Sequence, residues 1–139
     1  MNLLTRLARS NPLTTDLGLL VLRVWFGLTM AFVHGYGKLM NLGDFSAKVA
    51  KLGLPLPGVL GPAAGLSEFL GGILLALGLM TRLSSVSLIC TMSVAAFVVH
   101  AHDPFQKKEL ALCYGVAAVA LLLAGPGRFS ADARFFARK

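Results

Sequence analysis

The chain has 139 residues, of which 56% are hydrophobic and only 14% are charged, and its mean hydropathy is +0.75. Soluble domains are about half apolar and a quarter charged, so this composition excludes an ordinary soluble protein. It indicates a single integral membrane domain over residues 1–139. The formal net charge of +7 does not indicate nucleic-acid binding, because the cations lie at the ends of apolar runs, where membrane lipid is the expected partner.

Four long apolar runs predict an all-α fold, a transmembrane four-helix bundle with short interfacial helices. The predicted spans cover residues 17–37, 61–79, 83–102 and 108–124. The fourth span is short for a bilayer, which needs about 20 residues. Only Thr81 and Arg82 separate the second span from the third, so these two spans must be antiparallel neighbours.

Three further segments are predicted to be interfacial helices. The first precedes Pro12. Residues 44–52 place apolar side chains on one side of a helix and two lysines on the other, as expected for a helix on the membrane surface. The C-terminal tail has Ser130 as a helix cap and Phe135 and Phe136 facing lipid.

Lysines and arginines in the short loops predict the orientation. The side that holds both termini carries seven of them, namely Arg6, Arg9, Arg82, Arg128, Arg134, Arg138 and Lys139. The other side carries five, namely Lys38, Lys48, Lys51, Lys107 and Lys108. This bias predicts cytoplasmic termini in a bacterial-type inner (plasma) membrane.

Glu68 is the only carboxylate within the second span, and an acid at that depth persists only when it faces protein, water or a cation. In an up-down-up-down bundle, His34, His100 and Glu109 lie near the same interface, within about 10 Å of it. We therefore expect one polar layer drawn from four helices on the non-cytoplasmic side. Glu68 is expected near His34 or Lys38.

Small residues surround this acid, because Gly61, Gly65 and Gly72 share a helical stripe with Glu68 and allow close approach of another helix. Arg23 lies toward the opposite end of the first span. Two interpretations of Arg23 stay open: its stem reaches the headgroups, or its guanidinium caps carbonyls at the end of another span.

The two cysteines are not expected to form a disulfide. Cys90 and Cys113 differ in predicted depth by about 10 Å or more, whereas bridged α-carbons lie within about 7 Å. Cys113 lies one turn from Glu109, so a redox thiol stays open there.

Several segments in combination resemble the DoxX family of small four-helix membrane proteins. They are HGYGK in the first span, SEFLGGILLALGLMTR through the second, a histidine that closes the third, and GPGRFSAD after the fourth. The likeness covers residues 20–132 and implies a four-helix bundle linked to respiratory-type redox chemistry. Some relatives are subunits of thiosulfate–quinone oxidoreductases, and others act in quinone or thiol stress. The matching positions are Arg23, His34, Lys38, Glu68, His100, Glu109 and Arg128.

The first hypothesis is an oxidoreductase site for a quinone-like or thiol-bearing substrate, with quinone as the candidate cofactor. The candidate catalytic residues are His34, Glu68 and His100. The candidate substrate-binding residues are Arg23, Lys38, Glu109 and Cys113. No flavin or dinucleotide motif is evident, so electrons would come from a partner redox subunit, a bound metal or thiols.

Two alternatives stay open beside this hypothesis. In the first alternative the same cluster is a metal or haem site, although neither glutamate begins the Glu-x-x-His motif of di-iron bundles, and no metal ligands are assigned. The protein is otherwise a non-enzymatic membrane subunit, assembly factor or lipophile carrier whose polar cluster is structural. The substrate and the oligomeric state are not specified by the sequence.

Overall fold

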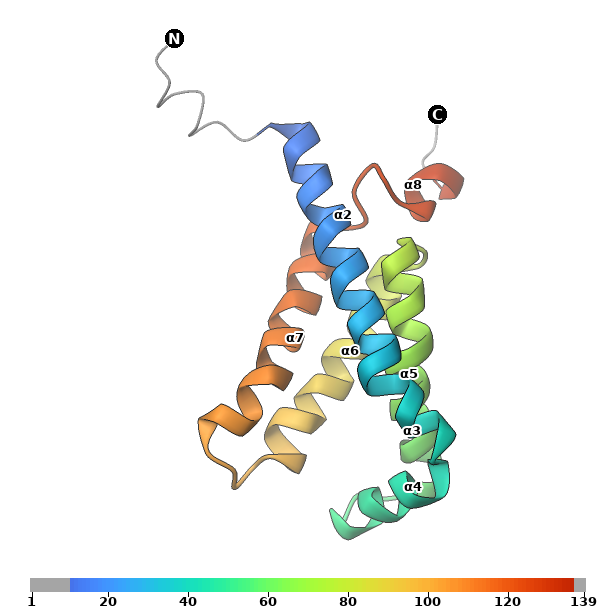
Figure 1. Ribbon diagram of the computed structural model, residues 1–139, viewed down its shortest axis with the longest axis vertical. Helices are drawn as coiled ribbons and strands as arrows, with labels where there is room; N and C mark the ends of the chain where they lie inside the picture. Colours follow the sequence, from blue (N-terminus) through green and yellow to red (C-terminus); the bar gives the residue numbers. More distant parts are fainter. Residues whose placement is uncertain (1–10, 137–139) are drawn as a thin grey trace.

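The computed structural model describes residues 11–136, which are almost entirely helical and contain no strand, as predicted (Figure 1). The α-helices and two π-helical segments are α2 (Pro12–Leu28), η1 (Thr29–Gly35), α3 (Tyr36–Met40), α4 (Leu42–Lys51), α5 (Pro57–Leu77), α6 (Thr81–Val94), η2 (Ala95–Val99), α7 (Phe105–Ala124) and α8 (Ala131–Phe136). The interfacial helix predicted before Pro12 falls outside the described residues.

Within residues 11–136, three continuous helices are long and apolar enough to cross a membrane, namely Pro12–Met40, Pro57–Leu77 and Thr81–Val99. They correspond to the first three predicted spans. The fourth, α7, has 20 residues, but Lys107, Lys108 and Glu109 occupy its beginning and leave a shorter apolar stretch. It completes the predicted bundle with charged residues at one end.

The helices run alternately up and down the bundle (Figure 1). The continuous helix α2–η1–α3 packs along α5, α5 packs along α6, and α6 packs along α7. The start of α2, the end of α7 and α8 lie at one end, which we call the terminal end (Figure 1). Helix α4 and the loop before α7 lie at the other end, which we call the α4 end.

Glycines bring the first two spans into backbone contact. A Cβ atom on Gly27 would lie 2.6 Å from the backbone nitrogen of Ala76, and one on Gly35 would lie 2.7 Å from the Cα atom of Phe69. Real side chains cannot approach so closely, so α2 and η1 rest directly on the α5 backbone. The predicted stripe on the second span is buried throughout, at Gly61, Gly65, Glu68 and Gly72.

A compact apolar cluster fills the middle of the bundle. Its buried members are Phe26, Met30, Leu75, Leu88, Met92, Ala118 and Leu121. Large apolar side chains also cover the outside, including Trp25, Val116 and Leu123, each at least 68% exposed. An apolar exterior around an apolar core is what lipid, rather than water, requires of a helical bundle.

Two π-helical segments lie in the part of the bundle nearer the α4 end. Segment η1 contains His34, and segment η2 ends immediately before His100. A π turn changes the direction of the side chains that follow, and such turns are frequent at functional sites. Along the first span, Arg23 and Met30 are buried, whereas His34 within η1 and Lys38 after it are only half-buried.

The helix predicted over residues 44–52 is present as α4, but Lys48, predicted on the side opposite the apolar residues, lines a cavity together with them. The apolar side chains Phe45, Val49 and Leu52 face this cavity, and Val49 is 6% exposed. Helix α4 packs against α5 through Ser46, which leaves no room for a side chain at Gly61. The apolar side of α4 thus covers protein.

Candidate functional site

The candidate site is a cavity of about 620 Å³ bounded by α4, α5, α6 and η2. Small-molecule sites typically measure about 300–1,000 Å³, so the cavity has the size of such a site. Most of its wall is apolar, with side chains that include Phe45, Val49, Leu52, Leu54, Leu60, Val94 and Val99. Polar groups gather at Lys38, Glu68 and His100 and at three hydroxyls.

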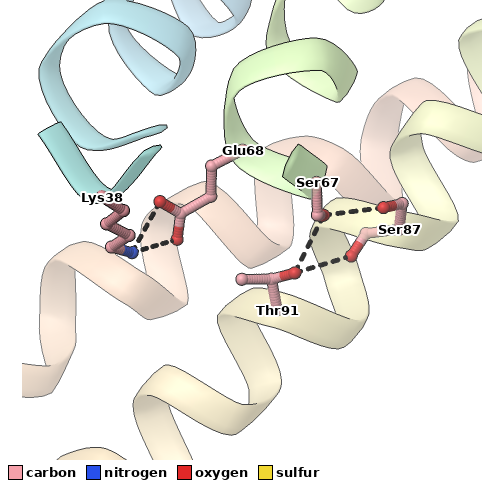
Figure 2. A network of polar contacts seen from close by, with 5 residues as sticks. All are labelled: Lys38, Ser67, Glu68, Ser87 and Thr91. Carbon is pink, nitrogen blue, oxygen red and sulfur yellow. Dashed lines mark hydrogen bonds and ion pairs between the residues drawn. The ribbon is translucent and has the colours of Figure 1, made fainter. Parts of the chain in front are cut away.

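An ion pair forms one polar corner of the cavity (Figure 2). The Nζ of Lys38 donates to Oε1 of Glu68 at 2.5 Å and to Oε2 at 2.6 Å. The Glu68 side chain is 1% exposed and that of Lys38 is 30% exposed. The expectation that Glu68 lies near His34 or Lys38 is confirmed for Lys38, which supplies the cation that a buried acid requires.

Lys38 also connects this corner to α4. Its Nζ lies 5.1 Å from the centroid of the Phe45 ring, within the range of a cation–π interaction. Lys38 follows η1, Glu68 lies on α5, and Phe45 lies on α4. One ammonium group therefore links three elements around the cavity.

Three hydroxyls form a second polar group beside Glu68 (Figure 2). The oxygens of Ser67 and Ser87 are 2.7 Å apart, and Oγ1 of Thr91 lies 2.9 Å from Oγ of Ser67. Sequence reasoning missed these residues. The available signal was the spacing of Ser87 and Thr91, one turn apart on the third span, with Ser67 next to Glu68 on the second.

His100 lies at the cavity wall but does not contact Glu68. Its Nδ1 lies 2.8 Å from Oδ2 of Asp103, and Lys107 lies 3.7 Å from the other carboxylate oxygen. The hydrogen bond from His100, and then the charge of Lys107, lower the pKa of Asp103. With an ionised Asp103, Nδ1 of His100 is the donor, which leaves Nε2 for another partner.

His34 lies outside the cavity wall, although it is close enough to Lys38 and Glu68 for their charges to act on it. Its ring packs edge-on against Tyr114 with centroids 5.3 Å apart, and Tyr114 stacks on Phe26 at 5.4 Å. His34 therefore faces α7 and is not part of the cavity wall. His34 lies within η1, and a π turn points its side chains in directions that differ from those of a regular α-helix.

Helix α7 contributes nothing to the cavity wall, so the prediction that four helices supply one pocket is wrong for this helix. Glu109 and Cys113 are both exposed on α7, which packs mainly against α6. Cys90 lines the cavity, and both cysteines are free, as the depth argument predicted.

Arg23 lies far from this cavity, although it was predicted to bind substrate. It precedes Lys38 by about four helical turns, or roughly 22 Å. Its side chain is buried, and its guanidinium donates to the backbone carbonyls of Pro126 and of Phe129, the latter at 2.6 Å. Of the two open interpretations, the structure supports the one in which Arg23 caps carbonyls beyond another span.

Asp132 reinforces the same end of the bundle. Its carboxylate accepts from the backbone nitrogens of Met80 at 2.8 Å and Thr81 at 2.9 Å, at the turn between α5 and α6. Ser130 accepts from the backbone nitrogen of Ala133, as predicted for a helix cap. We call Arg23, Asp132 and the loop 125–130 the terminal cluster.

The ligands considered for a metal do not converge. In the part of the chain that the structure describes, no group of three or more His, Cys, Asp or Glu side chains is placed to hold a metal ion. Glu68 pairs with Lys38, His100 pairs with Asp103, and His34 packs on Tyr114. The metal and haem alternative thus lacks the shared centre that it requires.

Comparison with known proteins identifies the family. The DoxX family model matches residues 18–101, more than half of the chain, and includes Lys38, Glu68 and the cavity-lining parts of α4, α5 and α6. The match ends before α7, the loop 125–130 and Asp132, and it includes Arg23. No curated protein and no solved structure gives a match. The chain belongs to the DoxX family and is an integral membrane protein.

Proposed function

We propose that this protein binds a quinone-like lipophile in the cavity beneath α4 and takes part in its redox cycle. The observation that supports this proposal is the Lys38–Glu68 pair at the wall of a largely apolar cavity of about 620 Å³. A quinone has the matching form, with an apolar ring or tail and polar carbonyl oxygens. Apolar walls with a few fixed polar groups are the usual composition of such a site.

The polar groups suit the chemistry of a quinone carbonyl. Reduction of a quinone to a quinol adds two electrons and two protons, and negative charge develops on the carbonyl oxygen. The ammonium of Lys38 stabilises that charge, and Glu68 holds Lys38 in position. His100 exchanges a proton through Nε2, while Asp103 fixes its ring from the loop side.

The electrons come from outside the chain. A partner redox subunit in the membrane is the proposed donor or acceptor, since the sequence carries no flavin or dinucleotide motif. A thiol-bearing substrate is the second form of this proposal, and free Cys90 at the cavity wall gives it a place to react.

The proposed orientation has the α4 end toward the periplasm and the terminal end toward the cytoplasm. The elements that carry the described members of the two groups lie at opposite ends of the bundle, with α8 at the terminal end and α4 and the start of α7 at the other (Figure 1). Four members of the cytoplasmic group, Arg6, Arg9, Arg138 and Lys139, lie outside the described residues. The supporting bias is that of positively charged loops in the cytoplasm.

Lipid extraction tests the proposal. The protein is purified in mild detergent, and the extracted quinone is quantified per mole of protein beside Glu68→Gln and Glu109→Gln variants. We expect quinone with the wild type and the Glu109→Gln variant and little with Glu68→Gln, because Glu109 is exposed and outside the cavity. The visible absorption spectrum of the same samples would reveal a haem, and measurement of their metal content would reveal a bound metal ion.

A structural, non-enzymatic role is the second candidate. It is favoured by the two short contacts of the Lys38–Glu68 pair, which satisfy both charges within the protein. In that case the wild type yields no quinone, and Glu68→Gln changes only the stability. The protein is then a membrane subunit, assembly factor or lipophile carrier.

A further inference from the structure

We infer that the ligand of this cavity is an acidic amphiphile, with one oxyanion at neutral pH on an apolar body, and that Lys48 of α4 selects it. The inference rests on the proposed function, because it specifies the chemical class of ligand for the same cavity. An acidic hydroxyquinone and a fatty acid share this chemistry.

The charges of the cavity wall do not balance. Lys38 and Lys48 line it, whereas Glu68 is its only carboxylate. Glu68 is committed to Lys38 by two contacts of 2.5 and 2.6 Å. Over residues 11–136, Lys48 has no carboxylate within 4.0 Å, and this includes Asp44 one turn away on the same helix. The wall therefore carries one positive charge without an internal partner.

The position of Lys48 on α4 makes this charge informative. The other side chains that α4 directs to the cavity are Phe45, Val49 and Leu52, all apolar. Lys48 and Lys51 are both exposed, but of these two lysines only Lys48 also lines the cavity. Lys51 therefore serves as a control for a lysine that contacts only solvent and headgroups.

The remaining wall fits a single oxyanion rather than a highly charged ligand. The three hydroxyls of Ser67, Ser87 and Thr91 bond mainly to one another, and the rest of the wall is largely apolar. One ammonium group, with Lys38 nearby, gives a charge-assisted contact to one anionic head. The apolar side chains of α5, α6 and η2 then contact the ring or tail.

Calorimetric titration of full-length protein in phosphatidylcholine nanodiscs tests the inference, with empty nanodiscs as the blank. The probes are menadione, a neutral naphthoquinone; lawsone, whose hydroxyl is ionised at neutral pH; and palmitate. We expect lawsone to bind about tenfold more tightly than menadione, as one charge-assisted contact provides. The Lys48→Gln variant should remove this preference, and the Lys51→Gln variant should retain it.

Salt gives a second readout that needs no variant. At an ionic strength of about 1 M the screening length is about 3 Å, so the preference for lawsone should shrink while menadione binding stays unchanged.

The outcomes separate this inference from the proposed function. Equal binding of menadione and lawsone, with no effect of Lys48→Gln, overturns the inference and leaves quinone binding intact. Palmitate binding that depends on Lys48, without binding of either quinone, supports the inference and overturns the quinone proposal. Binding of none of the three probes overturns both.

Discussion

Two regions of this bundle bury a charged side chain, and they surround it differently. Arg23 at the terminal end and Glu68 near the α4 end are each 1% exposed. Arg23 donates to two backbone carbonyls of the loop after α7, which belongs to the terminal cluster. Glu68 pairs with the side chain of Lys38 at the wall of a cavity.

The difference distinguishes a buried charge that fixes a loop from one at the wall of the cavity for which ligand binding is proposed. Backbone carbonyls are fixed, so the bonds of Arg23 hold one loop in one place, and Arg23 does not line the cavity beneath α4. Lys38 is 30% exposed and lines that cavity, where ligand binding is proposed. Burial of charge alone does not distinguish these cases, whereas the partner and the adjoining space do.

The largest expected effect comes from breaking the terminal cluster. Arg23→Gln removes two charged hydrogen bonds between a buried guanidinium and backbone carbonyls, and we expect a loss of about 3 kcal/mol in unfolding free energy. Thermal unfolding in detergent measures the loss. Arg128→Gln is the control, because Arg128 is exposed in the same loop. The folded fraction of the Arg23→Gln variant should still bind quinone. If this variant lost quinone binding without losing stability, the binding site would have to be at the terminal end.

The close packing of α2 on α5, between the two regions, gives the second test. In Gly27→Ala the new methyl group would lie 2.6 Å from the Ala76 nitrogen, so α2 and α5 must separate. We expect a destabilisation of about 2 kcal/mol from this overpacking. Gly18→Ala on the same helix meets nothing within 4 Å and should be neutral or slightly stabilising. Equal melting temperatures for the two variants would contradict the close approach.

Replacing the ion pair sharpens the assignment of binding to the α4 end. Glu68→Gln leaves Lys38 without its carboxylate, and we expect a cost of about 1–2 kcal/mol, since the half-buried ammonium can rehydrate. Lys38→Met combined with Glu68→Leu should recover most of that stability, because apolar pairs often replace buried ion pairs without loss. Quinone binding should stay absent in the double variant. If the double variant bound quinone as well as the wild type does, the ion pair would be structural.

The smallest expected effect is a pH dependence at the mouth of the cavity. The pKa of Asp103 lies below its ordinary value of about 3.9, since His100 donates to its carboxylate. A lowered pKa stabilises the folded protein above the ordinary value, and this contribution is lost as the pH falls through the lowered one. Melting temperatures below about pH 4 should therefore fall slightly less for Asp103→Asn than for the wild type. Identical acid profiles would argue against the contact.

The sequence alone predicted the class of the protein and part of its site. Hydropathy determined the membrane helices, since lipid requires long apolar segments. The acid in the second span required a cation, and Lys38 was one of two named candidates. The glycine stripe around Glu68 is buried as predicted, because helices approach closely only at small residues.

Only the tertiary structure decided which polar groups share a cavity. His34 in the π-helical η1 packs on Tyr114, and α7 packs on α6, so neither His34 nor Glu109 lines the cavity, and neither arrangement follows from a straight-helix pattern. The folding of α4 over α5 created the cavity and brought Lys48 to its wall. The depth of a residue along a span is set by local sequence, whereas the direction of its side chain depends on neighbouring helices. The depths of the polar residues were therefore predictable, and which of them meet in one cavity was not.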